Sequence, residues 1–466
     1  MVKKSLITLI VLLLFILTNT TISSTVVNAN NIDDYFPSKK QNQIGSLLYL
    51  PTIKSLNRII HPLNSNPLEL NDDNLEVLDY LSDCEIVGLG EATHGTKEFF
   101  QLKHRIFKYL VENHEYKIFA FECDMGEAYY INNFINEGEG DIDHLMKNIM
   151  HFWTWRTEEV KDLLIWMKDY NENKSEEEKI HFIGVDCQFL TYQADIIMSY
   201  FDETNISLPE DSLQFLTEID QIGWNISDYY SEITLGEKEA IDDKVNTLLT
   251  KFEDLRNELI SNSSEFEYKF VNQIALNIKQ VNDVLYGYTH NSLTNYRDLY
   301  MAQNTLWTTD LFGGNTKVAL WAHNAHVANS ESFEAMGLHL KEELQDDYQI
   351  IGFSFSVGSF TAVRTGVAGL IVTPWVPIKI WKPRRRSINY VFHHAQYNNF
   401  ILRALDIQEK SAFDRFISQH QRFLNIGAGF NRIFYIAGLY HSISKLMDEY
   451  DVVIHWDKTE AAEQLS

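Results

Sequence analysis

Five short apolar segments, each followed directly by a polar residue, are the most regular feature of the chain. They contain little polar alternation, which is typical of parallel strands covered on both faces. Long amphipathic stretches separate them, so the pattern predicts an α/β core. The segments are residues 85–90, 118–121, 180–185, 317–322 and 349–353.

The connecting stretches have helical periodicity. Phe99, Leu102 and Ile106 follow three- and four-residue spacing, and Thr157 is a plausible N-cap for an apolar stripe behind it. From residue 191 to residue 304 the chain is polar, acidic and without a strand pattern. We therefore expect a parallel sheet flanked by helices, a three-layer α/β/α fold, with a helical insertion subdomain.

This pattern divides the chain into three parts. Residues 1–29 have the features of a secretory signal peptide, with two lysines, an apolar run and a small-residue cleavage site near Ala29. An uncleaved anchor is the weaker alternative, because the apolar run is too short for a comfortable bilayer span. Residues 30–190 and 305–466 form the predicted catalytic core, and residues 191–304 form the predicted insertion or lid. A cleaved signal implies a secreted, extracellular protein without a stable membrane span.

The charge and cysteine content of the chain exclude several classes of partner and of fold. The 466 residues carry 39 Lys and Arg against 65 Asp and Glu, a net charge of −26. This charge argues against nucleic acid and makes anionic membranes poor candidate partners. Residues 382–386 form a basic run that we interpret as an exposed loop. Three cysteines, Cys84, Cys123 and Cys187, cannot form a disulfide framework, and we expect them to be buried thiols.

The first strand ends in the loop Gly90-Glu-Ala-Thr-His-Gly95, which contains the most informative polar pair. A carboxylate near an imidazole can set its tautomer, which would make His94, beside Glu91, a competent base for water. The flanking glycines allow backbone conformations closed to other residues. The alternative is a glycine turn with a surface Glu and His. Nucleotide binding is rejected, because Thr93 replaces the third fingerprint glycine and Glu91 would repel phosphate.

Other polar residues follow the remaining strands, and strand ends of a parallel sheet meet in one crevice. His323 and His326 are spaced for two metal ligands on one helical turn, or for one catalytic and one supporting imidazole. Metal dependence stays open, and no cofactor is expected. The complete set is Glu91, His94, Glu122, Asp186, His323 and His326.

Two further motifs bear on mechanism and binding. Ser354 lacks the second glycine of a GxSxG elbow, so covalent serine catalysis is disfavoured. The cluster of residues 151–156 places two indoles beside a guanidinium, and Trp155 with Arg156 could line a substrate pocket. Core packing is the alternative for either tryptophan.

Taken together, these motifs resemble the erythromycin esterase family from about Ile86 to Asp457. Each element is weak alone, but eight in order are specific. They are GLGEATHGTKEFFQLKHRIF at 88–107, FAFE at 119–122, WTWRTEEV at 153–160, IGVD at 183–186, YRDLYMAQNTLW at 296–307, VALWAHNAHVA at 318–328, MGLHL at 336–340 and YDVVIHWDKT at 450–459.

The resemblance implies hydrolysis of a cyclic ester without a covalent enzyme intermediate. It assigns His94 as the general base, Glu91 as the residue that orients it, and His323 as an assisting group. Supporting roles fall to Arg105, Glu122 and His326, with Arg105 or a protonated His323 stabilising the oxyanion. Asn324, Trp155 and Arg156 are the expected substrate-binding residues.

The substrate stays open at this point. Two small-molecule substrates fit the resemblance. One is a macrolide, whose hydrolysis would give the enzyme a role in antibiotic resistance, and the other is an environmental or cell-surface ester. Two other functions also stay open: a metal-dependent hydrolase that uses Glu91, His94, Glu122 and His323, and a haem- or iron-binding protein of the same broad fold group. The sequence does not indicate an oligomeric state.

Overall fold

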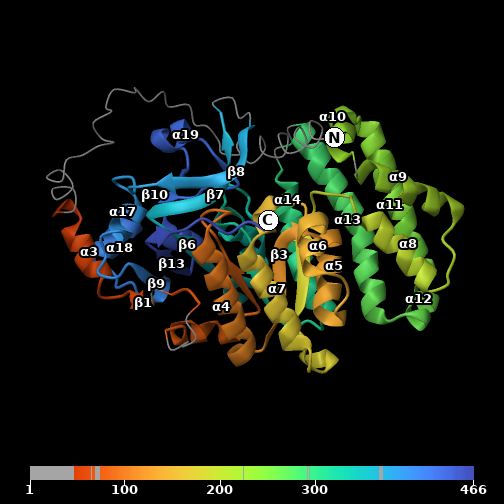
Figure 1. Ribbon diagram of the computed structural model, residues 1–466, viewed down its shortest axis with the longest axis horizontal. Coiled ribbons are helices and arrows are strands. Elements are labelled where there is room, and N and C mark those ends of the chain that lie inside the picture. Colours follow the sequence, from red (N-terminus) through yellow and green to blue (C-terminus); the bar gives the residue numbers. More distant parts are fainter. Residues whose placement is uncertain are drawn as a thin grey trace.

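The computed structural model describes residues 47–63, 66–68, 74–223, 225–290, 292, 294–366 and 371–465. The expected signal peptide, residues 1–29, lies outside the described residues. Figure 1 shows a central sheet between layers of helices, with a tall group of helices along one side. None of the described helices is both long and apolar enough to cross a membrane.

The main sheet has eight strands, of which the six from β13 to β4 run parallel. β9 pairs antiparallel with β13, and β1 pairs antiparallel with β9. All five predicted strands are present, and the predicted α/β class is confirmed. In spatial order the strands are β1 (His61–Pro62), β9 (Asn399–Arg403), β13 (Val452–Trp456), β6 (Tyr348–Ser354), β2 (Ile86–Leu89), β5 (Lys317–Trp321), β3 (Tyr116–Asp124) and β4 (His181–Asp186).

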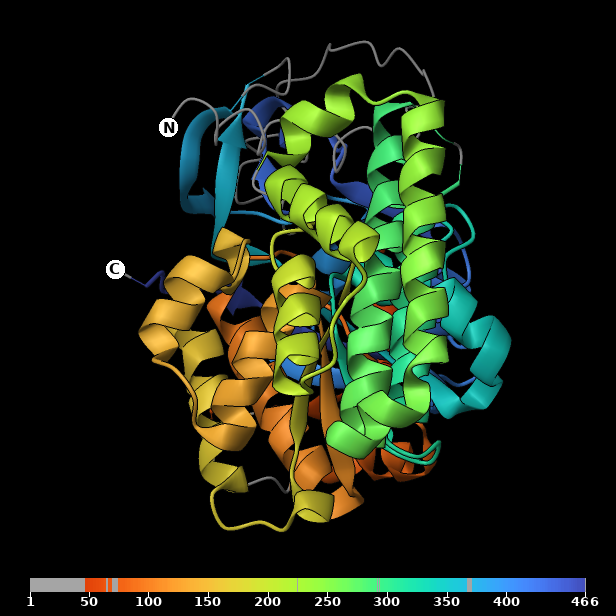
Figure 2. The same ribbon diagram turned by 90° about the vertical axis from the view of Figure 1, so that its right-hand side faces the viewer.

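Two hydrophobic cores lie on opposite faces of this sheet. Neighbouring strand residues alternate between them: Ile86 belongs to one core and Val87 to the other. The core with Val87 is covered by α4 (Lys97–His114), α5 (Met125–Glu137) and α7 (Glu158–Asn171), and Thr157 caps α7 as predicted. The core with Ile86 is covered by helices of the 193–344 region (Figure 2). The three-layer arrangement follows from strands that are apolar on both sides.

The region from Gln193 to Leu311 contains helices joined by short loops, and no strand, in its described part. Its long helix α13 packs against α8, α11 and α14, as Figure 2 shows. The division of the chain at residue 304 stays a prediction, and α14 runs across it. The helices are α8 (Gln193–Glu203), α9 (Glu210–Gly223), α10 (Ile226–Glu232), α11 (Leu235–Asp254), α12 (Arg256–Asn262), α13 (Glu265–Thr289) and α14 (Tyr296–Leu311).

Two smaller sheets lie beside the carboxyl ends of the main strands. β7 and β8 form an antiparallel hairpin that β11 and β14 extend, and β10 pairs with β12. These strands are β7 (Val357–Thr365), β8 (Ile371–Ile380), β10 (Gln421–Leu424), β11 (Gly429–Phe430), β12 (His441–Ser444) and β14 (Lys458–Thr459). The remaining α-helices are α3 (Leu50–Leu56), α6 (Ile142–His144), α15 (Asn324–Val327), α16 (Met336–Leu344), α17 (Ile388–Phe392), α18 (Ala412–Ile417), α19 (Arg432–Ala437) and α20 (Leu446–Glu449).

Cys84, Cys123 and Cys187 are free and buried, as predicted.

Candidate active site

The loop after β2 brings His94 against the carboxylate of Glu91. The distance between His94 Nδ1 and Glu91 Oε1 is 2.7 Å, and Glu91 is fully buried. Because an ionised carboxylate only accepts hydrogen bonds, Nδ1 carries the proton and Nε2 is left as a lone-pair base. Within the described part of the chain, no hydrogen bond engages Nε2, and the His94 side chain keeps a small exposed surface.

Two further donors hold the Glu91 carboxylate in place. Lys103, on α4, donates from Nζ to Glu91 Oε2 at 2.7 Å, and the Trp321 indole N–H at the end of β5 donates to the same oxygen at 2.9 Å. Burial lowers the pKa of Lys103 to about 8, although the charge of Glu91 opposes this effect. Lys103 also lies over the Trp321 ring, 4.2 Å from its centroid. The base is therefore supported by a rigid buried group of three residues.

The glycines that flank this loop are required for close packing. A Cβ atom at Gly90 would lie 2.3 Å from Asn324 Oδ1, and one at Gly95 would lie 2.1 Å from the Thr361 carbonyl oxygen. Neither glycine has a positive φ angle, so the expectation of a special backbone conformation is wrong. Space between neighbouring backbones, rather than torsional freedom, explains these two residues.

His323 lies beside His94, with 4.8 Å between the ring centroids. Its Nδ1 accepts a hydrogen bond from the Ala325 N–H at 3.1 Å, so its proton is on Nε2, which donates to the Ile426 carbonyl at 3.2 Å. Burial, with the neighbouring His94, holds the pKa of His323 well below its ordinary value. His323 is therefore a neutral imidazole, which makes the protonated form considered from the sequence unfavourable here.

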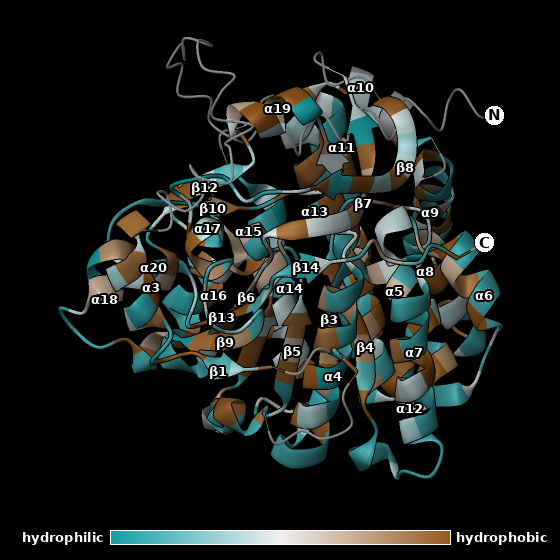
Figure 3. Ribbon diagram, turned by 60° about the vertical axis from the view of Figure 1, so that its left-hand side comes forward, coloured by the Kyte–Doolittle hydropathy of each residue, from teal (hydrophilic) through white to brown (hydrophobic). Residues whose placement is uncertain are grey.

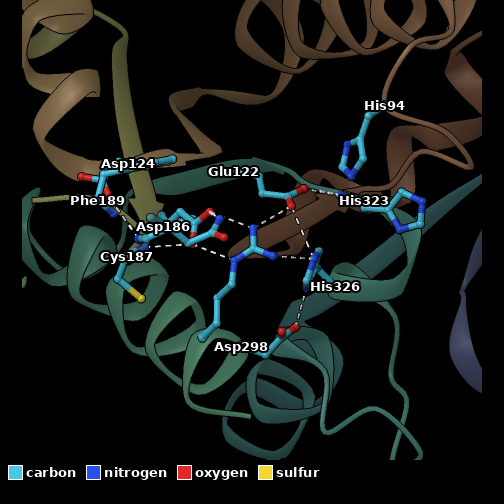
Figure 4. Close-up of polar contacts among 12 residues, drawn as sticks. His94, Glu122, Asp124, Asp186, Cys187, Phe189, Asp298, His323 and His326 are labelled. Atoms are coloured by element: carbon cyan, nitrogen blue, oxygen red, sulfur yellow. Dashed lines mark hydrogen bonds and ion pairs between the residues drawn. The ribbon is translucent and has the colours of Figure 1, made fainter. Parts of the chain in front are cut away.

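Glu122 connects the two histidine loops to a buried ion network (Figure 4). The parallel register of β3 shifts between Phe121 and Asp124, where Glu122 turns toward the His323 backbone N–H and accepts from it at 2.7 Å. Arg297, from α14, bridges Glu122 at 2.9 Å and Asp186 at 2.7 Å. Burial would raise the pKa of Glu122, but His326, His94 and Arg297 outweigh it and hold this pKa below its usual range.

His326 lies at the other side of Glu122. Its Nδ1 is 2.7 Å from Asp298 Oδ1, and its Nε2 is 3.4 Å from Glu122 Oε1 and 3.2 Å from Arg297 Nη1. Burial would lower the pKa of His326, but Asp298 and Glu122 outweigh it and raise the pKa above its ordinary value. Because the Arg297 guanidinium only donates, its hydrogen bond makes His326 Nε2 an acceptor, and the imidazole proton is on Nδ1, which donates to Asp298.

The other predicted site residues are placed in less direct positions. Trp155 is buried against His94, 5.8 Å between ring centroids, and donates its indole N–H to the Glu122 carbonyl. Arg156 donates to the backbone carbonyls of Met150 and His151. The fully buried Asn324 amide bonds to the backbone of Phe353 and to Asn425. Arg105 donates to Asn74, ahead of β2.

Several residues of the site were absent from the sequence prediction. Lys103 and Trp321 support Glu91, whereas Arg297 and Asp298 complete the network around Glu122 and His326. Arg297 and Asp298 belong to the motif at 296–307, and an Arg-Asp pair inside a helix that follows a long acidic stretch was the available signal. No signal in the sequence distinguished Lys103, because α4 carries several cations at similar spacing.

Ser354 is part of a separate buried cluster. Its Oγ lies 3.1 Å from His455 Nδ1, and His455 Nε2 lies 3.5 Å from Asp457. Ser354 and His455 have no exposed surface, and the Asn389 amide also contacts the serine hydroxyl. This arrangement stabilises the junction of β6 and β13, and it offers a substrate no access to the hydroxyl. Within the described ranges, no group of three or more His, Cys, Asp or Glu residues is arranged to hold a metal ion.

Comparison with known proteins identifies the class of this protein. Erythromycin esterase type II of Escherichia coli is 27% identical over 330 residues, which are 64% of this chain and 76% of that protein. The putative hydrolase YbfO of Bacillus subtilis is 24% identical over 346 residues, 67% of this chain and 75% of that protein. These similarities indicate a hydrolase.

Solved structures share the fold. A protein described as a succinoglycan biosynthesis protein has a TM-score of 0.76 at 24% identity, covering 90% of this chain and 99% of its own. A mutant of the erythromycin esterase EreC in an open conformation has a TM-score of 0.62 at 18% identity. The match covers 86% of this chain and 97% of that chain. The erythromycin esterase family matches residues 111–459. The chain belongs to this family.

Proposed function

We propose that the protein is a carboxylic ester hydrolase in which His94 activates water for attack on an ester or a macrolactone. The hydrogen bond between His94 Nδ1 and buried Glu91 supports this proposal best, because it leaves Nε2 unprotonated and open to solvent. A neutral imidazole with a free ring nitrogen can accept a proton from water. Lys103 and Trp321 donate to Glu91 Oε2 and so fix the carboxylate that sets the tautomer of His94.

In the proposed reaction, Nε2 of His94 takes one proton from water as the water oxygen bonds to the ester carbonyl carbon. The carbonyl oxygen becomes an oxyanion in a tetrahedral intermediate. When this intermediate collapses, the bond to the alkoxy oxygen breaks and the proton on His94 passes to that oxygen. The products are a carboxylic acid and an alcohol, or one hydroxy acid from a lactone, and His94 returns to its starting state.

We assign stabilisation of the oxyanion to the Nε2–H of neutral His323. This imidazole lies beside His94, with 4.8 Å between the ring centroids, and its Nε2–H donates to the Ile426 carbonyl at 3.2 Å, a distance at the long end of the range for a hydrogen bond. A substrate oxygen can therefore compete for this donor. His326 lies at the other side of Glu122, where Asp298 and Arg297 already bond both of its ring nitrogens.

Membership of the family supports an ester as the substrate class, and two candidate substrates fit this class. The Escherichia coli relative is named an erythromycin esterase, which makes a macrolide lactone one candidate. The predicted signal peptide at residues 1–29 supports an exported enzyme, for which an environmental or cell-surface ester is the other candidate. Both require the same water attack on an ester carbonyl.

A hydrolysis panel tests the proposal. The purified protein is assayed on simple esters, lactones and macrolides, with product acids measured directly. His94→Ala should lower turnover about 100-fold or more, because the base is lost. His420→Ala is the matched control, since His420 is exposed and outside the site.

Near wild-type turnover in a folded His94→Ala protein would contradict the role of His94. A second arm with a chelator tests the metal-dependent alternative. If a chelator abolishes activity and a defined metal restores it, the enzyme is a metal-dependent hydrolase, and His94 alone does not activate the water. Turnover of one substrate class, lost in His94→Ala and unaffected by chelator, is the expected result.

A further inference from the structure

A surface of unusual composition lies at one end of the molecule. We define the basic apolar surface as β8, residues 381–386, α19 and β12. It belongs to two segments, residues 348–405 and 415–447, that contain no Asp or Glu, although the whole chain has 65 of them. In a protein with a net charge of −26, this is a local reversal of charge.

The same surface exposes large apolar side chains. Trp381 is 65% exposed and Ile443 is 62% exposed, and Figure 3 shows hydrophobic residues along α19 and β8 at this outer end. Single exposed apolar residues are ordinary, but a contiguous group of them indicates an interaction surface. The exposed apolar residues are Val372, Trp375, Trp381, Ile433, Ile436, Leu439 and Ile443.

Contacts between the segments show that the surface is one structural unit. The guanidinium of Arg432 lies 5.4 Å from the Trp381 ring centroid and donates to the Lys379 carbonyl. Arg384 donates to the Ile436 carbonyl at 2.9 Å, and Ile443 of β12 is paired in register with Arg422 of β10. The apolar side chains of α19 and the 381–386 segment are therefore held together.

Four exposed cations of this surface form no ion pair with a described acidic residue. They are Lys379, Lys382, Arg386 and Arg432. Elsewhere in the described structure, exposed lysines such as Lys244 and Lys269 are paired with glutamates. Unpaired cations beside exposed tryptophans are the arrangement found at the interface of anionic bilayers, where the indole lies at headgroup depth.

We propose that the basic apolar surface binds the surface of an anionic lipid bilayer. The strong negative charge of the whole chain predicts repulsion from such membranes, and the acid-free segments remove that repulsion on one face. Binding is peripheral: the tryptophan and isoleucine side chains enter the interfacial region, and the four unpaired cations contact lipid phosphates.

This surface is also connected to the candidate active site. The small sheets that carry it contact the loop of His94, because the Thr361 N–H donates to the Gly95 carbonyl at 2.8 Å and the Ile426 N–H donates to the Ala92 carbonyl at 2.6 Å. Docking on a bilayer would therefore place that loop on a rigid support near the lipid. Lipid binding itself does not depend on the proposed hydrolysis.

Vesicle flotation of the full chain tests the proposal. Phosphatidylcholine vesicles with and without phosphatidylglycerol are compared, and lipids with brominated acyl chains report tryptophan insertion by fluorescence quenching. We expect binding that requires phosphatidylglycerol and weakens with salt. The variant K379Q/K382Q/R386Q should lower partitioning about 100-fold, since each cation near the surface strengthens binding severalfold. W381S/I433S should abolish most of the quenching.

Matched controls separate this surface from the rest of the chain. K54Q/K244Q/K269Q removes three exposed lysines elsewhere, and L213S/L235S removes two exposed leucines of the helical region. Both should bind as the wild type does. Any binding through residues 1–29 is common to all variants and cancels between them. Circular dichroism of each variant confirms that it is folded.

Three results would overturn the proposal. The first is vesicle binding that is equal with and without phosphatidylglycerol. The second is binding that the surface variants retain at wild-type strength. The third is self-association in sedimentation velocity that W381S/I433S abolishes without any vesicle binding, which would make the surface an interface between copies of this chain.

Discussion

Two buried groups on either side of the His94–His323 pair differ in how they are built. The first, around Glu91, is local: His94 and Lys103 lie within twelve residues of the carboxylate, and one ring nitrogen of His94 stays open. The second, around Glu122, draws Asp186, Arg297 and His326 from distant parts of the chain. In that group most donors and acceptors are already satisfied by one another.

This difference separates chemistry from scaffolding. The Glu91 group keeps one basic atom free, so it can exchange a proton with a water molecule. The Glu122 group joins β3, β4, α14 and α15 through buried charges, and each of these charges depends on its partners to remain stable. We therefore expect substitutions in the Glu122 group to act mainly on folding, and substitutions in the Glu91 group to act mainly on turnover.

The largest effect is expected for Arg297→Leu. This change leaves Glu122 and Asp186 as buried carboxylates without their shared cation, which should lower the free energy of unfolding by about 3–5 kcal/mol. Urea unfolding followed by circular dichroism measures the change. Arg256→Leu is the matched control, since Arg256 forms an exposed pair with Glu265 and should cost less than about 1 kcal/mol. Equal losses in the two variants would contradict the structural role of the Glu122 group.

The two groups also differ in how well the sequence predicts them. The five apolar segments predicted five of the six parallel strands, because strands covered on both faces have a simple pattern; the sixth, β13, was not predicted. Glu91 and His94 could be paired because they are three residues apart in one loop. Arg297 and Asp298 reach the site only through the packing of α14. The Arg-Asp pair in the sequence indicates a charged position on that helix, but it does not indicate which strand this position will face.

The cation on α4 illustrates the same limit. The resemblance favoured Arg105, whereas the structure places Lys103 on Glu91 and Arg105 on Asn74. The two residues are about half a turn apart on the helix, so they lie on different faces. Only the tertiary packing of α4 against β2 and β5 decides which of them is buried beside the carboxylate.

A smaller effect, on turnover rather than folding, is expected for Glu91→Gln. An amide can donate to His94 Nδ1 as well as accept from it, so it no longer fixes the proton on Nδ1. Part of the population would then have the unproductive tautomer, and turnover should fall about 100-fold. The ester panel measures this change. Glu112→Gln, an exposed substitution on α4, is the control.

A double variant distinguishes positioning from independent catalysis. If Glu91 acts through His94, then Glu91→Gln should lower turnover little further when His94 is already alanine. A full additional 100-fold loss in the double variant would show that Glu91 contributes to the reaction by another route.

The smallest effect on turnover is expected for Lys103→Met. This variant tests whether the Glu91 group acts only in catalysis or also stabilises the fold. Turnover should fall about tenfold, because Glu91 loses one of its donors but keeps His94 and Trp321. Lys108→Met, an exposed change on the same helix, should leave turnover unchanged.

Lys103 also makes a pH-dependent contribution to folding whose sign follows from its pKa. Burial, opposed by Glu91, lowers this pKa from 10.5 in the unfolded chain to about 8 in the folded protein. Between these values the unfolded chain binds the extra proton, so stability relative to Lys103→Met should rise as pH increases from about 8 to 10.5. Urea midpoints of both proteins across this window measure the difference. A difference that stays constant or falls with pH would mean that Glu91 holds Lys103 charged, and the Glu91 group would then stabilise the fold as the Glu122 group does.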